Sequence, residues 1–113
     1  MNQAPARYRH PPLDPEYRAD MLARVREIVL GVLAGRKVDV YLFGSFARGG
    51  EMHYSDIDVA IDAQEPLSAS LRVGLSEALE NSTIPRRVEI VDLSSCGREM
   101  REAVRREGVR WNA

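Results

Sequence analysis

Apolar side chains recur every three or four positions between residues 14 and 35, which is the spacing of one face of a helix. Asp14 and Pro15 form a favourable N-cap and first-turn pair, and Gly35 is a favourable stop. The pattern therefore predicts a helix of about six turns, with Arg18 on its polar face. The inward face consists of Tyr17, Met21, Leu22, Val25, Ile28, Val29, Val32 and Leu33.

Three apolar runs, at residues 37–43, 57–61 and 86–93, have the composition of strands. They are rich in β-branched or aromatic side chains and are bounded by turn residues. Helical spacing returns in residues 67–79, with Leu71, Leu75, Ala78 and Leu79 inward. It returns again from Ser94 or Ser95 to Arg106, with Met100, Ala103 and Val104 available for packing.

The order of these elements predicts an α/β (α+β) fold, with a small mixed β-sheet flanked by helices. Residues 1–13 hold three prolines and few apolar residues, so we expect a flexible lead-in there. Residues 14–113 should form a single domain. In the tail after Gly108, Trp111 either packs on the core or marks a partner surface.

A glycine turn follows the first predicted strand, because residues 44–50 read GSFARGG. A short helix can begin at Ser45, which would point the backbone N–H groups near Gly44 and Ser45 outward and make the turn a phosphate cradle. Arg48 either neutralises phosphate charge or faces solvent. His53, in the loop that follows, is more simply a bystander than an acid or base.

Two carboxylates, Asp56 and Asp58, stand two residues apart in the second predicted strand. Alternation places both on one face, where their repulsion favours a shared cation. Hard oxygen ligands suit Mg²⁺ with a nucleotide phosphate completing its shell, so the inferred ligand is a metal-bound nucleoside triphosphate. Asp62 has the same parity and is either an outer group of this site or a solvated loop residue.

Gly44-Ser45, ten further residues and then Asp56-Ile57-Asp58 resemble the signature of the DNA polymerase beta-like nucleotidyltransferase superfamily. The short chain resembles its minimal nucleotidyltransferase branch. The resemblance implies that fold, and a third carboxylate from a later, neighbouring strand. Glu89 stands at that position, where the family more often has Asp, whereas Asp92 falls on the opposite strand face.

The resemblance also implies a mechanism, in which Asp56, Asp58 and Glu89 hold two Mg²⁺ ions while ATP is the donor. Gly44, Ser45 and Arg48 would then bind the triphosphate, and AMP would pass to an acceptor hydroxyl. In one of the two settings that the resemblance to the minimal branch allows, that acceptor is a tyrosine on a helical HEPN-type toxin, which this chain would neutralise as its antitoxin.

Two alternatives stay open at this point, and both also involve a homo- or hetero-oligomer. The chain can be a catalytic subunit that works with a separate helical subunit on a small molecule. It can instead be a non-catalytic antitoxin or binding module that acts by contact alone. A small-molecule transferase of the antibiotic-resistance type would need an acceptor domain or a dimer to complete its site.

Composition narrows the partners further. The formal net charge is −1, from 16 basic and 17 acidic residues, so long nucleic acid is disfavoured as a partner. The lone Cys96 cannot form an internal disulfide and is read as an ordinary helix residue. No signal sequence or membrane-spanning run is visible, so we expect a cytoplasmic protein without membrane association.

Overall fold

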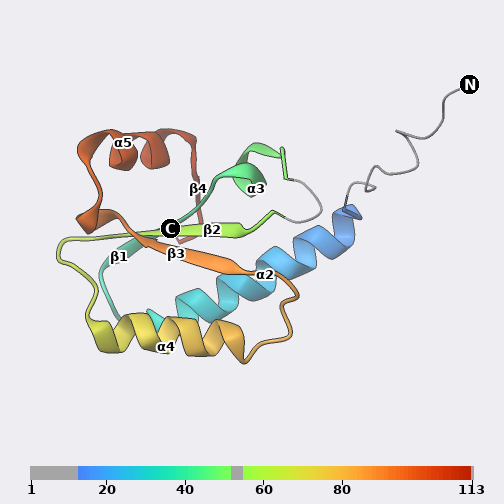
Figure 1. Cartoon of the computed structure of the whole chain (residues 1–113), viewed down its shortest axis with the longest axis horizontal. Helices are drawn as coiled ribbons and strands as arrows, with labels where there is room; N and C mark the ends of the chain where they lie inside the picture. Colours follow the sequence, from blue (N-terminus) through green and yellow to red (C-terminus); the bar gives the residue numbers. More distant parts are fainter. Residues whose placement is uncertain (1–12, 52–54, 113) are drawn as a thin grey trace, which may run out of the picture.

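The computed structural model describes residues 13–51 and 55–112 (Figure 1). The predicted lead-in therefore lies, apart from Leu13, outside the described residues, and so does His53. The elements, in chain order, are α2 (Pro15–Val32), β1 (Val38–Phe43), α3 (Ser45–Arg48), β2 (Ile57–Ala63), α4 (Ala69–Glu80), β3 (Val88–Asp92), the 3₁₀ turn η1 (Leu93–Ser95), α5 (Arg98–Glu107) and β4 (Val109–Arg110).

The four strands form one mixed sheet in the order β3-β2-β1-β4. β1 is antiparallel to β2 and to β4, whereas β2 and β3 are parallel. Helices α2 and α4 cover one face of this sheet and α5 lies over the other (Figure 1). The expected mixed sheet flanked by helices is confirmed, and so is the expectation that the strand of Glu89 lies beside that of Asp58.

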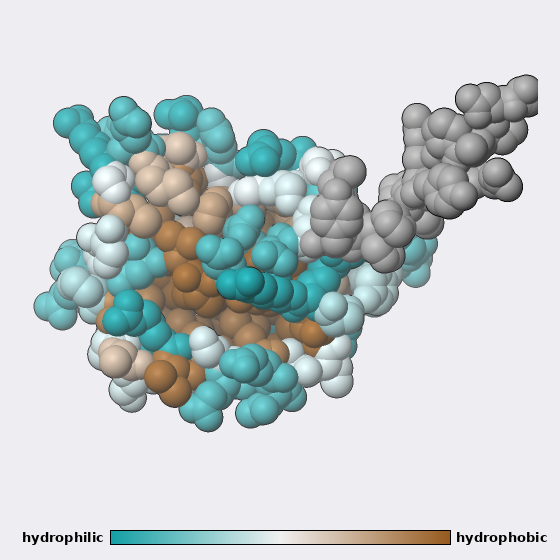
Figure 2. All heavy atoms as spheres, in the orientation of Figure 1, coloured by the Kyte–Doolittle hydropathy of each residue, from teal (hydrophilic) through white to brown (hydrophobic). Residues whose placement is uncertain are grey.

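The hydrophobic core is divided between the two faces of the sheet because successive strand residues point to opposite sides. The larger cluster joins α2 and α4 to the sheet through residues such as Val25, Leu75 and Ile61. The smaller cluster, under α5, contains Tyr41, Ala60, Leu93 and Val104. Hydrophobic side chains also show at the surface near the edge strand β3, between the hydrophilic surfaces of α4 and α5 (Figure 2).

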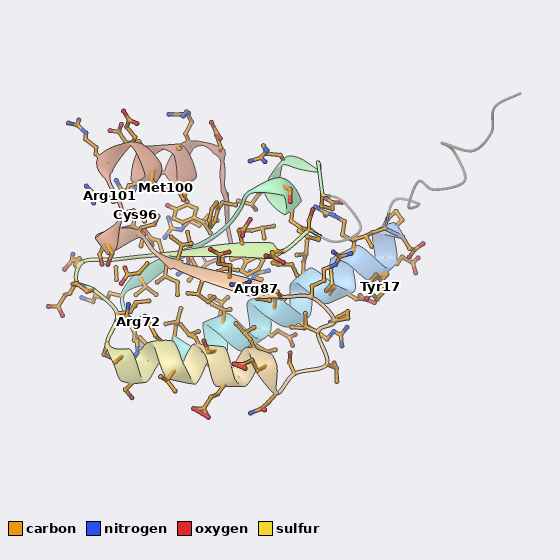
Figure 3. The ribbon with its side chains drawn as sticks, viewed as in Figure 1. Tyr17, Arg72, Arg87, Cys96, Met100 and Arg101 are labelled. Carbon is orange, nitrogen blue, oxygen red and sulfur yellow. The ribbon has the colours of Figure 1, made fainter. Side chains whose placement is uncertain are left out.

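Helix α2 begins at Pro15 as predicted, and Asp14 caps it by accepting a hydrogen bond from the Tyr17 N–H at 3.1 Å. It ends at Val32, earlier than Gly35, which adopts a positive φ of 81° in the turn that follows. The inward position predicted for Tyr17 is wrong, because its side chain is 42% exposed. The first turn of α2 extends past the end of the sheet, so Tyr17 has no strand to pack against (Figure 3).

Within the described residues, no helix is both long and apolar enough to cross a membrane.

The end of the chain differs from the prediction in two ways. The last helix begins at Arg98 and not at Ser94 or Ser95, because the Asp92 carboxylate binds the N–H and hydroxyl of Ser94 and holds Leu93–Ser95 in a separate 3₁₀ turn. Met100 is also less buried than its helical position suggested, with 36% of it exposed.

The predicted tail contains a short strand, β4, that pairs with the edge of β1. Pairing continues beyond it, since the Trp111 N–H donates to the Val40 carbonyl at 2.7 Å. The Trp111 side chain is buried in the core, so of the two readings left open the packing one is correct. The Asn112 side chain then forms hydrogen bonds to the edge of β1 like those of a paired strand. It accepts from the Val40 N–H at 2.8 Å and donates to the Val38 carbonyl at 2.6 Å.

Replacing Asn112 with Ala is expected to lower the free energy of unfolding by about 1–3 kcal/mol, because two half-buried backbone groups of β1 lose their partner. Urea denaturation would measure the change. The matched control is Asn81→Ala, at an exposed position that ends α4, which should change the stability by less than about 0.5 kcal/mol. Equal losses in the two variants would contradict this role for Asn112.

Candidate active site

The first part of the site is the turn between β1 and α3. Gly44 has φ 74° and ψ −154°, a conformation that is essentially confined to glycine. Its carbonyl accepts hydrogen bonds from the N–H groups of Ala47 at 3.1 Å and Arg48 at 3.2 Å, which starts the short helix. Gly49, with φ 75°, ends it. The predicted short helix at Ser45–Arg48 is confirmed, and Ser45 lies at its start.

Gly44 also has no room for a side chain, because the Asp58 carboxyl group occupies the space. A Cβ built on Gly44 would lie 3.2 Å from Asp58 Cγ and would overlap Asp58 Oδ2. The contact follows from the strand register, in which Phe43 is paired with Asp58. The glycine turn and the second carboxylate of the D-x-D motif are therefore in direct contact.

The carboxylates predicted as metal ligands lie at the same end of the sheet. Asp58 and Glu89 are register partners on the parallel strands β2 and β3, so their side chains leave the same face. That face also carries α5 and Tyr41. Asp56 directly precedes β2, two residues before Asp58.

Electrostatics links four of the predicted site residues. Burial raises the pKa of Asp58 above its ordinary value, and the negative charges of Glu89 and Asp56 raise it further, while the positive charge of Arg48 opposes them. An ionised Asp58 is therefore costly unless a cation approaches. This environment and the all-oxygen donor set suit a hard divalent ion such as Mg²⁺. As the side chains stand in the described part of the chain, no three Asp, Glu, His or Cys residues are close enough to hold an ion.

Asp62 does not join the site, although it shares the parity of Asp58. It lies at the opposite end of β2, facing Asp39 on β1, and forms an ion pair with Arg105 at 2.8 Å. Asp39 is paired in turn with Arg110 at 2.7 Å. These partly exposed pairs link the sheet to α5 and β4. Asp62 is therefore not an outer group of the site, and it is not a solvated loop residue either.

Asp92 is also structural, as its face predicted. Its carboxylate accepts hydrogen bonds from the Leu67 N–H at 2.9 Å and from Ser94. Burial alone would raise the pKa of Asp92, but these hydrogen bonds outweigh burial and lower it. An ionised Asp92 thus ties the end of β3 to the segment that leads into α4.

Sequence reasoning did not predict a group of contacts that connect α3 and the loop after it to distant arginines. Arg18, predicted to lie on the polar face of α2, forms an ion pair with Glu51 at 2.9 Å and donates to the Phe46 carbonyl. Arg86 donates to the Ser55 carbonyl at 2.9 Å. Helical or strand periodicity could not identify these contacts, because the partners are separated by up to 33 residues in the sequence.

Comparisons with known proteins place this geometry among nucleotidyltransferases. The family model described as polymerase beta, nucleotidyltransferase matches residues 36–110. One curated relative, the probable protein adenylyltransferase MntA of Haemophilus influenzae, is 39% identical over 67 residues. That match covers 59% of this chain and 59% of the relative, so it spans less than two thirds of the relative's length.

Solved structures resemble most of this chain. A crystal structure of a toxin–antitoxin with AMP-PNP has 28% sequence identity and a TM-score of 0.63, covering 78% of this chain and 73% of that one. A mutant of the toxin–antitoxin MntA-HpeT has 25% identity and a TM-score of 0.60, covering 78% and 72%. Both likenesses cover more than two thirds of this chain and of the solved chain.

Proposed function

Because this chain belongs to the polymerase beta nucleotidyltransferase family, we propose that it transfers AMP from ATP to a hydroxyl group of a partner protein. The observation that carries the proposal is the meeting of Asp58, its register partner Glu89 and the Gly44 turn at one end of the sheet. The acceptor oxygen forms a bond to the α-phosphorus of ATP, while the bond between that phosphorus and the oxygen bridging to the β-phosphate breaks. Pyrophosphate then leaves, and the hydroxyl proton is released.

Each site residue has a role in this proposal. Asp56, Asp58 and Glu89 would hold Mg²⁺, as two ions, which when bound neutralise triphosphate charge and lower the pKa of the acceptor hydroxyl. Glu89 is one methylene longer than the Asp more common in the family, but it offers the same carboxylate oxygens. Gly44 and Ser45 would bind the β- and γ-phosphates. Arg48, which interacts electrostatically with Asp58, would neutralise phosphate charge beside them.

The acceptor in this proposal is a tyrosine on a helical HEPN-type toxin, which makes the chain an antitoxin, with residues 14–113 as its single catalytic domain. Two of the comparisons support this choice over a small-molecule acceptor. The curated relative is named a probable protein adenylyltransferase. The solved structure bound to AMP-PNP, an ATP analogue, is that of a toxin–antitoxin.

Intact mass measurement tests the proposal directly. The helical partner that co-purifies from the native host is incubated with this protein, Mg²⁺ and ATP, and its mass should rise by one or more AMP groups. Asp56→Ala/Asp58→Ala should abolish the increase, because both carboxylates of the D-x-D motif are gone. A tight complex whose mass does not change with ATP, GTP, CTP or UTP would contradict the proposal and favour a module that acts by contact alone.

A further inference from the structure

Phe46, on α3, lies close to two arginines from distant parts of the chain. The ring is 2% exposed and belongs to the core below the sheet. The guanidinium carbons of Arg18 on α2 and Arg86 before β3 each lie 5.5 Å from the ring centroid. A guanidinium at this distance from an aromatic ring is attracted to it. The position of α3, and thus of the glycine turn at its start, is therefore linked to both arginines.

Arg18 holds the beginning of the loop that leads from α3 to β2. Its Nε and Nη2 donate to the two carboxylate oxygens of Glu51 at 2.9 and 3.2 Å, and Nη2 also donates to the Phe46 carbonyl at 2.5 Å. Burial would raise the pKa of Glu51, but the Arg18 hydrogen bond and charge, with the charge of Arg86, lower it. The bidentate pair is thus held in its ionised form.

Arg86 holds the end of the same loop, directly before Asp56. Its Nη1 donates to the Ser55 carbonyl at 2.9 Å, and the neighbouring carbonyl of Arg87 accepts from the Ile57 N–H at 3.0 Å. The backbone on both sides of Asp56 is therefore bonded to residues 86–87. This segment continues into β3, whose second residue is Glu89. Arg87, directly before β3, is labelled in Figure 3.

We infer that Arg86 is a positioning residue, which aligns Asp56 with Glu89 and, through Phe46, with the glycine turn. The inference rests on the proposed function, since it concerns the ligand set of that site. Arg86 is not assigned a contact with substrate, because its guanidinium is directed to the Ser55 carbonyl and the Phe46 ring. Arg18 supports the same arrangement from α2 by holding Phe46 and Glu51.

The test compares Arg86→Met with the matched control Arg24→Met. Arg24 also joins α2 to the segment before β3, through a hydrogen bond of 2.6 Å to Thr83, but it is not among the residues that contact the loop or Phe46. Mn²⁺ binding to the unmodified protein and to each variant is measured by calorimetry. Hydrogen exchange at residues 55–58 and the melting temperature are measured on the same samples.

Arg86→Met is expected to weaken Mn²⁺ binding by about 10–100-fold, the usual effect of losing a group that orients metal ligands. It should also speed hydrogen exchange at residues 55–58, while Arg24→Met changes neither quantity. Arg86→Lys keeps the charge but not the planar fork, so it should recover part of the binding. This milder variant decides the question by the same two readouts if Arg86→Met does not fold.

Normal Mn²⁺ affinity and normal exchange in the Arg86 variants would overturn the inference and leave the proposed function intact. If Arg24→Met weakens Mn²⁺ binding and speeds exchange at residues 55–58 as much as Arg86→Met does, the inference is also overturned. A general loss of stability would then be the cause of both changes. Failure of the unmodified protein to bind either Mn²⁺ or ATP is a different result. It would overturn the proposed function itself, and the inference with it.

Discussion

Asp58→Asn is expected to reduce nucleotidyl transfer at least about 100-fold, the size of loss seen when one group that stabilises transition-state charge is removed. Asn keeps the shape of the side chain beside Gly44 but cannot provide a carboxylate to a metal ion. Single-turnover transfer of radiolabelled AMP to the partner would measure the loss. Unchanged transfer would contradict the assignment of Asp58 as a metal ligand.

The same substitution should make the metal-free protein more stable near neutral pH. The pKa of Asp58 is raised by burial and by the charges of Glu89 and Asp56. The folded protein therefore binds the proton more tightly than the unfolded chain, and ionising Asp58 costs stability as the pH rises through its pKa. Urea denaturation should show that Asp58→Asn is stabilising at about pH 7, with a smaller difference below about pH 3, where both states are protonated.

Asp62→Asn is the matched control for both measurements, since Asp62 is on the same strand with the same parity. Its ion pair with Arg105 lies at the other end of β2. We expect unchanged transfer and only a small change in stability, because the Arg105 side chain is about half exposed. Comparable loss of transfer in the two variants would mean that charge anywhere on this face matters, and not the position of Asp58.

Gly44→Ala is expected to be damaging in two independent ways. The backbone of Gly44 lies in a region that costs other residues about 1–3 kcal/mol, so the variant should unfold at lower urea concentration. The new methyl group would also overlap Oδ2 of Asp58 and push the carboxylate away. A displacement of about 1 Å in a reacting group can cost about 100-fold in rate, so transfer should fall by that order.

Gly49→Ala separates the two effects. Gly49 has φ 75°, close to the 74° of Gly44, but an added Cβ would meet nothing within 4 Å. This variant should lose about 1–2 kcal/mol of stability through backbone strain alone and keep most of its transfer activity below its melting temperature. A loss of transfer in Gly49→Ala equal to that in Gly44→Ala would show that strain in α3, and not contact with Asp58, controls activity.

Several elements could be predicted because their signals are local. The N-cap at Asp14, the glycine turn and the alternation that places Asp58 apart from Ile57 depend only on neighbouring residues. The third carboxylate came from the resemblance to the polymerase beta-like family, and the membership is confirmed by the family match. The ligand role of Glu89 itself stays a prediction.

Other features could not be read from local pattern because distant segments create them. The two-residue strand β4 is too short to have a periodicity, and it forms because β1 offers an open edge. Tyr17 has helical spacing on the inward face, but the sheet below it ends too early to bury it. Asp62 has the parity of a site residue, but it lies four residues after Asp58, at the other end of β2, where it forms an ion pair with Arg105.

By itself, the sequence predicted the glycine turn and the D-x-D motif as the candidate site, and their pattern indicated the family to which the chain belongs. Only the tertiary structure decided how those residues are held. It pairs Asp58 with Glu89 and places Asp58 against Gly44, and it brings Arg18 and Arg86 to the ring of Phe46. The physical reason is that composition and spacing encode local conformation, whereas charge–charge effects, ring contacts and hydrogen bonds act between atoms a few ångströms apart in space, however far apart they are along the chain.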